Sequence, residues 1–437
     1  MSDPLFVPDG DPRGPGEGCD DGPVRYETAN REQIELQPCD LEALLPPGHA
    51  ARLVWRFVEG LDLTAMYAAI KAREGGPGRS PIDPKILVAL WLYATIDGVG
   101  SAREVDRLCY AHDAYRWLRG GVSVNYHTLS DFRVAHEAAL TDLLTQSIAA
   151  LLHRGVVTMA RVAQDGTRVR GSAGAGSFRR RPTLEDALRA ARKQVVRTAR
   201  QTDGSGPSRE AAAAARAARE RLARVEEALA HLPQIEALKQ KQGKKASAPR
   251  VSTTDPDVRV MKMADGGYRP AYNVQFATDV DSRTILGVAV TNQGHDRTAL
   301  APMLDQIEQR TGHRPAAHLV DGGFVNKDVI TAVADRGVTV YAPLFVREGR
   351  TRELGARVPG DTPAVEAWRA RMASDDGQRV YKTRGATAEW VNADGRTHRV
   401  LDRIPVRGLQ KVHTWALWIA LAHNLMRTME LVPHLMT

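Results

Sequence analysis

The order of apolar segments after Val156 limits the fold of this chain more than any other feature. An apolar, β-branched run at Val156–Ala163 is typical of a β-strand, and two further strand-like runs follow at Tyr272–Val280 and Ile285–Thr291. Residues 281–283, between the last two runs, have the composition of a hairpin turn. We therefore expect three strands, of which the last two form a hairpin.

Helices and strands alternate after this hairpin. The pattern predicts a helix over Thr298–Thr311, a short strand at Ala317–Val320, a helix capped by Asn326 and a fifth strand at Val338–Ala342. The order is strand, strand, strand, helix, strand, helix, strand, which indicates an α/β domain with a hairpin leading into a partly parallel sheet. The ribonuclease-H-like fold has this order, and we assign that fold to residues 156–430.

One segment within this domain does not fit the sheet. Residues 181–250 contain 16 Lys plus Arg against 8 Asp plus Glu, an excess equal to the net charge of +8 of the whole chain. Their Ala-rich composition predicts a basic helical insertion of two helices, divided at 204–207. Contact with the DNA backbone is one interpretation of this charge. A solvated helical hairpin without a partner is the other.

The residues before the strand pattern are expected to be helical. Residues 1–24 are rich in Pro, Gly and Asp and poor in apolar side chains, which predicts a disordered tail. Residues 25–155 predict an all-α N-terminal domain: Asp83 precedes a proline at one helix start, Ser101 can cap a second helix, and a third begins near Thr128. These short helices fit either a helix-turn-helix DNA-binding unit or a plain helical bundle.

The composition of the whole chain indicates a polyanionic partner. The net charge is +8, and the three cysteines match no metal-ligand spacing, as expected for an intracellular chain without disulfides. The longest apolar runs, Ile86–Ile96 and Trp415–Leu425, are shorter than the roughly 20 residues of a membrane helix. The chain has no G-x4-G-K-[ST] loop for ATP. We expect a cytoplasmic, chromosome-associated protein that needs neither membrane nor ATP.

Two aspartates stand where predicted strands end. Asp165 follows the first strand and Asp321 follows the short parallel strand, and each is followed by Gly. The carboxyl ends of neighbouring parallel strands lie at the same edge of a sheet, which is where ligand sites form. Carboxylates are preferred ligands of Mg²⁺, and two divalent ions about 4 Å apart can stabilise both oxygens of a phosphodiester cleavage. The pair therefore predicts a metal site, although an Asp-Gly pair alone also fits a turn.

Spacing alone does not select a third carboxylate. Periodicity gives no reason to prefer Glu389 over Glu353 or Glu366 as the third metal ligand. Three residues after the third strand, Asn292, Gly294 and Asp296, fit either an approach to the metal ions or a capped turn into the next helix.

Several stretches of the chain resemble the DDE insertion-sequence transposases, in particular their eleven-eighty-two-like group. Tyr381, Arg384, Glu389 and Arg396 form Y-x2-R-x4-E-x6-R, similar to the Y-x2-R-x3-E-x6-K of the related groups, with one extra residue between Arg and Glu and with Arg in place of Lys. The other similar stretches are 80–84, 116–118, 127–132, 164–170, 177–181, 406–412 and 421–426.

This resemblance implies a function and a set of site residues. The implied activity is that of a DNA transposase, which binds the terminal inverted repeats of a mobile element and catalyses metal-dependent cleavage and strand transfer. Asp165, Asp321 and Glu389 would be the catalytic residues and the ligands of two Mg²⁺ or Mn²⁺ ions. The implied partner is double-stranded DNA, both transposon ends and target, bound by a homodimer or higher oligomer. The alternatives are a structure-specific ribonuclease-H-like nuclease and a catalytically inactive DNA-binding relative.

DNA binding is assigned to three places in the chain. A helix fits the major groove, so the helix that begins near Thr128 is predicted to read base edges; a bundle helix that faces water is the alternative. A basic run precedes the insertion, and the resemblance adds residues around Glu389. The predicted DNA-binding residues are Arg133 in the N-terminal helix, Arg179, Arg180 and Arg181 before the insertion, and Tyr381, Arg384 and Arg396 near the third carboxylate.

Overall fold

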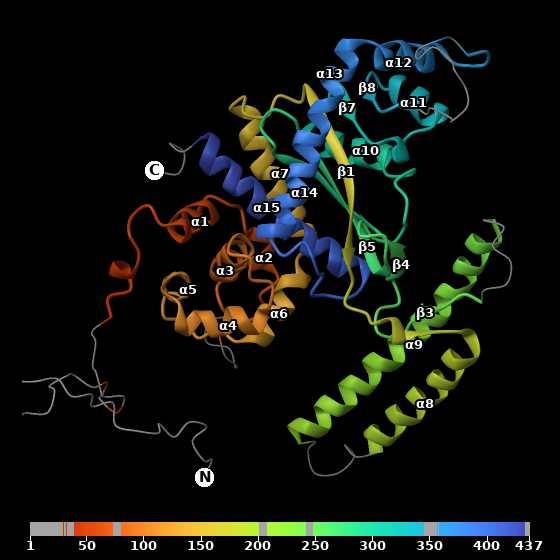
Figure 1. Ribbon diagram of the computed structural model, residues 1–437. Helices are drawn as coiled ribbons and strands as arrows, with labels where there is room; N and C mark the ends of the chain where they lie inside the picture. Colours follow the sequence, from red (N-terminus) through yellow and green to blue (C-terminus); the bar gives the residue numbers. More distant parts are fainter. Residues whose placement is uncertain are drawn as a thin grey trace, which may run out of the picture. The chain divides into compact units, whose positions relative to one another are not determined.

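The computed structural model describes most of the chain from residue 39 onward (Figure 1). The predicted tail at 1–24 and the predicted break between the insertion helices at 204–207 lie outside the described residues. Leu41–Thr437 forms one compact unit, which contains every helix and strand of the described residues. The described residues are 39–72, 80–200, 208–241, 248–344 and 358–432, with single positions at 29, 32 and 356.

Helices form the first part of this unit, as predicted. Asp83 accepts a hydrogen bond from the backbone of Lys85 and Ser101 accepts one from Glu104, which confirms both predicted helix starts. The third predicted helix begins at Tyr126, two residues before Thr128. The elements are η1(Glu42–Leu44), α1(Ala50–Glu59), α2(Thr64–Ala68), α3(Pro84–Ile96), α4(Ala102–Ala111), α5(Asp113–Arg119), α6(Tyr126–Ala135) and α7(Glu137–His153).

Two apolar helices join this helical region to the sheet. Nearly every residue of α3 is buried, and so are Val412 and Thr414 to Leu425 of α15(Leu409–Leu431), because both helices are apolar around most of their circumference. Helix α15 packs on α3 and α7 and also on the sheet. One continuous apolar core therefore includes residues of the helical region and of the sheet.

The sheet is mixed and contains six strands. Strand β5 pairs antiparallel with β1 along one edge, while β4 and β6 share its other edge; β1, β7 and β8 are parallel. The order predicted from the sequence is confirmed from β5 to β8. The strands are β1(Arg161–Arg170), β4(Arg259–Lys262), β5(Tyr268–Asp279), β6(Ile285–Thr291), β7(Ala317–Leu319) and β8(Thr339–Tyr341).

The first strand differs from its prediction. It begins at Arg161 instead of Val156, so Asp165 lies inside the strand and not after it. Val157 and Met159 are buried and give residues 156–160 a strand-like pattern, but Met159 has a φ of 58°, which is incompatible with an extended chain. The polar half of β1 is held in the sheet because β5 pairs with it as far as Arg170.

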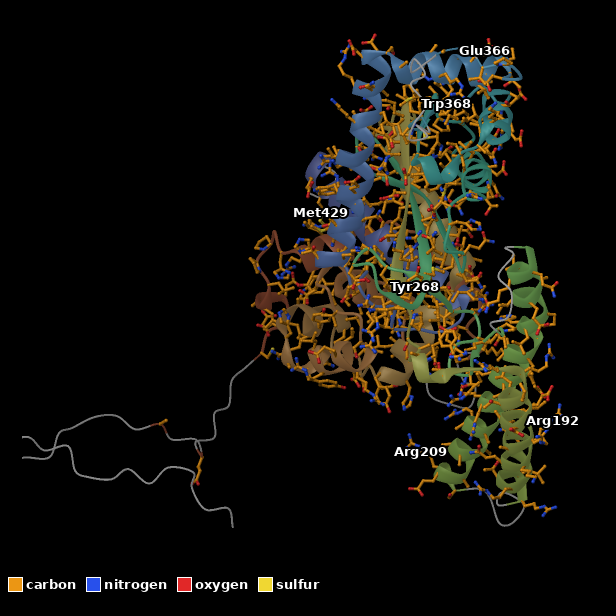
Figure 2. All side chains as sticks on the ribbon, turned by 45° about the vertical axis from the view of Figure 1, so that its right-hand side comes forward. Arg192, Arg209, Tyr268, Glu366, Trp368 and Met429 are labelled. Atoms are coloured by element: carbon orange, nitrogen blue, oxygen red, sulfur yellow. The ribbon has the colours of Figure 1, made fainter. Side chains whose placement is uncertain are left out.

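Helices pack against the parallel strands of the sheet, and the chain then returns to strand β1 near the middle of the sheet. A second apolar cluster is formed where α10, α11 and α12 meet β8, with Phe324, Val340 and Trp368 among its members; Trp368 projects from α12 in Figure 2. The elements are α10(Leu300–Thr311), η3(Gly322–Phe324), α11(Lys327–Ala334), α12(Pro363–Ala373), α13(Asp375–Arg384), the π-helical turn η4(Gly385–Glu389) and α14(Trp390–His398).

Two long helices occupy the predicted insertion. Helix α8(Arg181–Arg200) and helix α9(Arg209–Lys241) lie side by side (Figure 1), and they are antiparallel because Arg181 pairs with Glu236 while Arg192 pairs with Glu226. Their base is fixed by the short strand pair β2(Phe178–Arg179) and β3(Val251–Ser252), and by a small apolar cluster that includes Leu184, Leu232 and Val251.

Candidate active site

Strand register brings Asp165 and Asp321 to the same edge of the sheet. Ala163 of β1 is the parallel partner of Leu319 of β7, and each aspartate follows its strand's paired residue by two positions. Neighbouring strands lie about 4.8 Å apart. Asp165 is half-buried, whereas Asp321 is exposed at the start of the η3 turn, where its side chain accepts a hydrogen bond from the Gly322 amide.

The glycine after Asp165 is required by the packing around it. The backbone N–H of Gly166 donates to Asp165 Oδ1 at 3.0 Å. A Cβ at this position would lie 2.2 Å from Gln275 Nε2, 2.6 Å from Asp296 Oδ1 and 2.7 Å from Asn273 Oδ1, closer than real Cβ contacts. The glycine therefore lets the side-chain ends of Gln275, Asp296 and Asn273 pack closely over the strand residue next to Asp165.

Glu389 reaches the same place from a π-helical turn. Its neighbour Ala388 is buried and packs with Ala163 of β1 and Leu319 of β7, which holds the turn against the two strands that carry the aspartates. The side chain of Glu389 is 65% exposed. The extra residue between Arg384 and Glu389 falls inside this turn, so their side chains still meet.

Arg384 lies between the carboxylates. One guanidinium nitrogen is 3.7 Å from Asp165 Oδ1 and another is 3.4 Å from Glu389 Oε1. The guanidinium also lies 5.8 Å from the ring centre of Tyr381. Burial lowers the pKa of Arg384, but Tyr381 and the two aspartates outweigh burial and raise it, so this cation stays charged. The predicted residues of the Tyr-Arg-Glu pattern thus share one site.

Burial and the charges of neighbouring side chains shift the pKa of Asp165. Burial raises the pKa of this carboxyl above its ordinary value, the positive charge of Arg384 opposes that rise, and the nearby charges of Asp296 and Asp321 add to it. Tyr381 is affected in the same way: burial raises its pKa, Arg384 lowers it, and Asp321 and Asp165 raise it. These mutual effects place Asp321 and Asp296 within the same electrostatic neighbourhood as Asp165.

Asn392 also belongs to this site, and the sequence pattern did not single it out. It follows Glu389 by three residues on the same helix face, and its Nδ2 donates to Asp165 Oδ2 at 3.2 Å. Its Oδ1 is buried without a hydrogen-bond partner among the described residues. The only sequence signal for Asn392 is its position three residues after Glu389, and this signal is useful only once Glu389 is known to belong to the site.

The remaining predicted DNA-binding residues lie at different distances from the site. Arg396 is exposed on α14 and donates to the hydroxyl of Thr167 on β1, close to Asp165 in the strand. Arg179 and Arg180 are exposed at the neck of the insertion, and Arg181 is exposed but pairs with Glu236 at 3.5 Å. The basic run therefore belongs to the base of the helical pair and not to the carboxylate site.

The structure corrects the DNA-binding role predicted for Arg133. Its side chain is buried in the helical core, where the guanidinium donates to the Gly100 carbonyl at 2.5 Å and lies 4.8 Å from the ring centre of Trp91. Trp91 and Trp418 fix the neighbouring helices through hydrogen bonds to the carbonyls of Leu129 and Arg133. A cation in this position stabilises the packing of α3, α6 and α15 and is not accessible to a DNA base.

A second group of polar ligands lies away from the site. Glu227 and His231 of α9 and Asp257 before β4 place ligand atoms within 4.8 Å of one another. His231 Nδ1 already contacts the Pro256 carbonyl at 3.0 Å, and Asp257 Oδ2 accepts from the Leu409 amide at 2.8 Å. These bonds connect α9, the start of α15 and the sheet.

No helix in the described part of the chain is both long and apolar enough to cross a membrane.

Comparisons with known proteins agree with this geometry. The profile of the family described as "Transposase DDE domain" matches residues 237–425, which include Asp321 and Glu389, and the profile described as "Transposase domain (DUF772)" matches residues 39–135. Neither the curated proteins nor the solved structures give a match. Transposase DDE domains act on DNA and use divalent metal ions. With a transposase profile on the helical region and another on the carboxylate site, the chain belongs to the DDE-type insertion-sequence transposases.

Proposed function

We propose that this transposase binds the terminal inverted repeats of its element and catalyses metal-dependent DNA cleavage and strand transfer at Asp165, Asp321 and Glu389. The supporting observation is the contact of Arg384 with both Asp165 and Glu389, at 3.7 and 3.4 Å. Asp165 and Asp321 each follow, by two residues, the last parallel pair of β1 and β7. Three carboxylates from separate elements are thus gathered at one edge of a ribonuclease-H-like sheet.

The donor atoms of the site suit a hard divalent cation. Asp165, Asp321 and Glu389 offer carboxylate oxygens, and no cysteine among the described residues lies near them. Asn392 is 8% exposed, and its unpartnered Oδ1 is a further oxygen next to Asp165. Mg²⁺ and Mn²⁺ prefer oxygen ligands of this kind. We assign the two ions to the three carboxylates.

The chain's own residues prepare the site for phosphodiester chemistry. The ions, when bound, would activate a water or a 3′-hydroxyl and stabilise the leaving oxygen. Asp165 and Asp321 are fixed by the sheet and by amides of their following glycines, which limits their motion. Arg384 neutralises the carboxylates from the side of α13, and exposed Arg396 can pair with a phosphate.

The direct test is a cleavage assay on DNA that carries the element's ends. We expect the full chain with Mg²⁺ or Mn²⁺ to produce free 3′-hydroxyl ends and, with target DNA, joined products, and we expect EDTA to prevent both. Cutting without joining would indicate a nuclease instead of a transposase. Binding without cutting under any metal would indicate a catalytically inactive relative.

The outer face of α8 is proposed to bind the DNA backbone. Lys193, Arg197 and Arg200 are exposed on this helix, together with a half-exposed Val196, and line a shallow surface with Arg192. Figure 2 shows Arg192 on the helical pair. Arg192 and Arg189 have acidic partners on the helices, whereas none of the described residues pairs with the other three cations. Unpaired cations gain most from a phosphate.

Replacing Lys193, Arg197 and Arg200 together by Gln is expected to weaken DNA binding in a salt-dependent, sequence-independent way. Each cation that neutralises a phosphate contributes about 0.9 to the slope of log K against log salt, so the slope should fall by about 2 to 3. The matched control replaces Arg209, Arg216 and Arg219 of α9 by Gln, which removes the same charge. An equal fall in both variants, or none in the first, would contradict a specific α8 contact.

Recognition of the terminal repeats is proposed to involve the groove between the starts of α4 and α6. Exposed Arg103 lies 5.0 Å from the ring centre of Tyr126, and exposed His127 lines the same groove. Ser130 provides a further polar group there, while Asp131 provides the opposite charge. With Arg133 buried, Arg103 is the accessible cation of this groove among the described residues that line it.

The change Arg103→Ala with His127→Ala is expected to remove the footprint on terminal-repeat DNA. The measurement uses the full chain with Glu389→Gln to prevent cutting, because the N-terminal helices share their core with α15 and the sheet. Arg107→Ala is the control, since Arg107 lies one turn further along α4 and pairs with Glu104 at 2.6 Å. A footprint that survives the double change would move specificity to another part of the chain.

A further inference from the structure

Asp296 lies close to the glycines that follow the two aspartates of the proposed site. It lies in the loop between β6 and α10. Its Oδ1 is 2.6 Å from where a Cβ of Gly166 would be, next to Asp165, and its Oδ2 is 4.0 Å from where a Cβ of Gly323 would be, two residues after Asp321. Its negative charge also reaches Asp165. The loop thus brings a fourth carboxylate to the same edge of the sheet.

The two oxygens of Asp296 have different environments. Oδ1 accepts from Asn273 Nδ2 at 2.7 Å and from Gln275, two residues of β5 that are at most 1% exposed. Gln275 is held in turn by Gln164 of β1, whose Nε2 donates to Gln275 Oε1 at 3.2 Å. Oδ2 accepts no hydrogen bond from the described residues, and it is the oxygen that lies over the turn after Asp321.

A turn cap would not need this arrangement. Two buried amides donate to one oxygen and leave the other free, which fixes the direction of the carboxylate. Asn273 has a second, unpartnered atom: its Oδ1 is buried without a hydrogen-bond partner among the described residues, and it lies over Gly166 beside Asp296 Oδ1 and the amide nitrogen of Gln275. A carboxylate that is held through one oxygen by buried donors and keeps its other oxygen free is oriented as a metal ligand would be.

We propose that Asp296 is a fourth carboxylate ligand of the metal site, oriented by Asn273 and Gln275 and directed through Oδ2 at the ion shared by Asp165 and Asp321. This inference rests on the metal-dependent function proposed above. It adds a ligand from the loop after the hairpin, so that four segments of the chain hold the ions.

The test measures Mn²⁺ binding by electron paramagnetic resonance on the full chain without DNA. Asp296→Asn keeps an oxygen for Asn273 and Gln275 but removes the charge, and it is expected to weaken Mn²⁺ binding at least tenfold, as Asp321→Asn should. Asp402→Asn, an exposed acid between α14 and α15, is the control and should bind as the wild type does. Wild-type affinity in Asp296→Asn together with loss in Asp321→Asn would overturn the fourth ligand alone. Absence of Mn²⁺ binding in the wild type would overturn the metal-dependent function itself.

A second variant separates ligation from folding. Asp296→Cys offers a thiolate, which prefers Cd²⁺, and a thiolate-to-cadmium absorption band is expected on Cd²⁺ titration. Asp402→Cys and the wild type, which share the chain's own cysteines, are the controls. The band in Asp296→Cys alone would support ligation even if Asp296→Asn folds poorly. Its absence would show that this side chain does not face the ion.

Discussion

Asp165→Asn, Asp321→Asn and Glu389→Gln are each expected to abolish DNA cleavage and strand transfer while DNA binding survives. Each change removes one negative charge at nearly constant shape from a site whose role is to hold divalent ions. Loss of an ion removes several kcal/mol of transition-state stabilisation, so the cleavage rate should fall by roughly a thousandfold or more. Cleavage of end-containing DNA and gel-shift affinity should be measured on the same preparations.

Glu366→Gln is the matched control for this experiment. Glu366 is equivalent to Glu389 when only sequence spacing is considered, but it lies in the first turn of α12, where Figure 2 labels it, and not on the turn that carries Glu389. Its replacement should leave the cleavage rate unchanged. If Glu389→Gln cut at the wild-type rate and Glu366→Gln did not, the third carboxylate would be misassigned.

His318→Leu is expected to remove part of the acid sensitivity of the fold. His318 is fully buried in β7 and neither ring nitrogen has a hydrogen-bond partner among the described residues, so burial lowers its pKa from 6.5 to about 3. Between these values the unfolded state binds a proton that the folded state does not. The free energy of unfolding should therefore fall as the pH drops below 6.5, by at most about 1.4 kcal/mol per pH unit from this group.

The measurement is urea unfolding of wild type and variant at several pH values between 4 and 8. At pH 7 the variant should be at least as stable as the wild type, because no hydrogen bond is lost. Its stability should then decline less steeply below pH 6.5. His313→Leu, at an exposed histidine after α10, is the control and should follow the wild type. Parallel curves for His318→Leu and wild type would show that His318 is protonated in the fold.

The hairpin and the later strands could be predicted because their signals are local. Strand β6 has the predicted limits, and its turn is closed by Ser282, whose N–H and hydroxyl both donate to Asp279. Strand β4 was not predicted: it is short and carries charged residues, and only its pairing with β5 keeps it extended. The same cause extends β1 through polar residues that have no strand pattern of their own.

The site was predictable where a residue's position in a strand determines its neighbours. Asp165 and Asp321 follow from parallel pairing, although Asp165 lies within β1 and not beyond it. Arg133 was misassigned because a cation in an amphipathic helix is usually exposed, and its burial depends on Trp91 from a different helix. Asn392 depends on where α14 sits, which spacing alone does not reveal.

The π-helical turn that ends at Glu389 allows the same site geometry to form with a different spacing between Arg384 and Glu389. In a regular helix one additional residue would rotate all later side chains by about 100° around the axis, and Glu389, Asn392 and Arg396 would leave the face that meets β1. The π-helical turn accommodates the additional residue, so the later side chains stay on the same face of the helix. Chains with three or four residues between this Arg and Glu can then share one arrangement of ligands. An insertion of one residue in this turn therefore leaves the positions of the ligands unchanged. A sequence motif with a fixed Arg-to-Glu spacing would place such proteins in different groups although their sites have the same geometry.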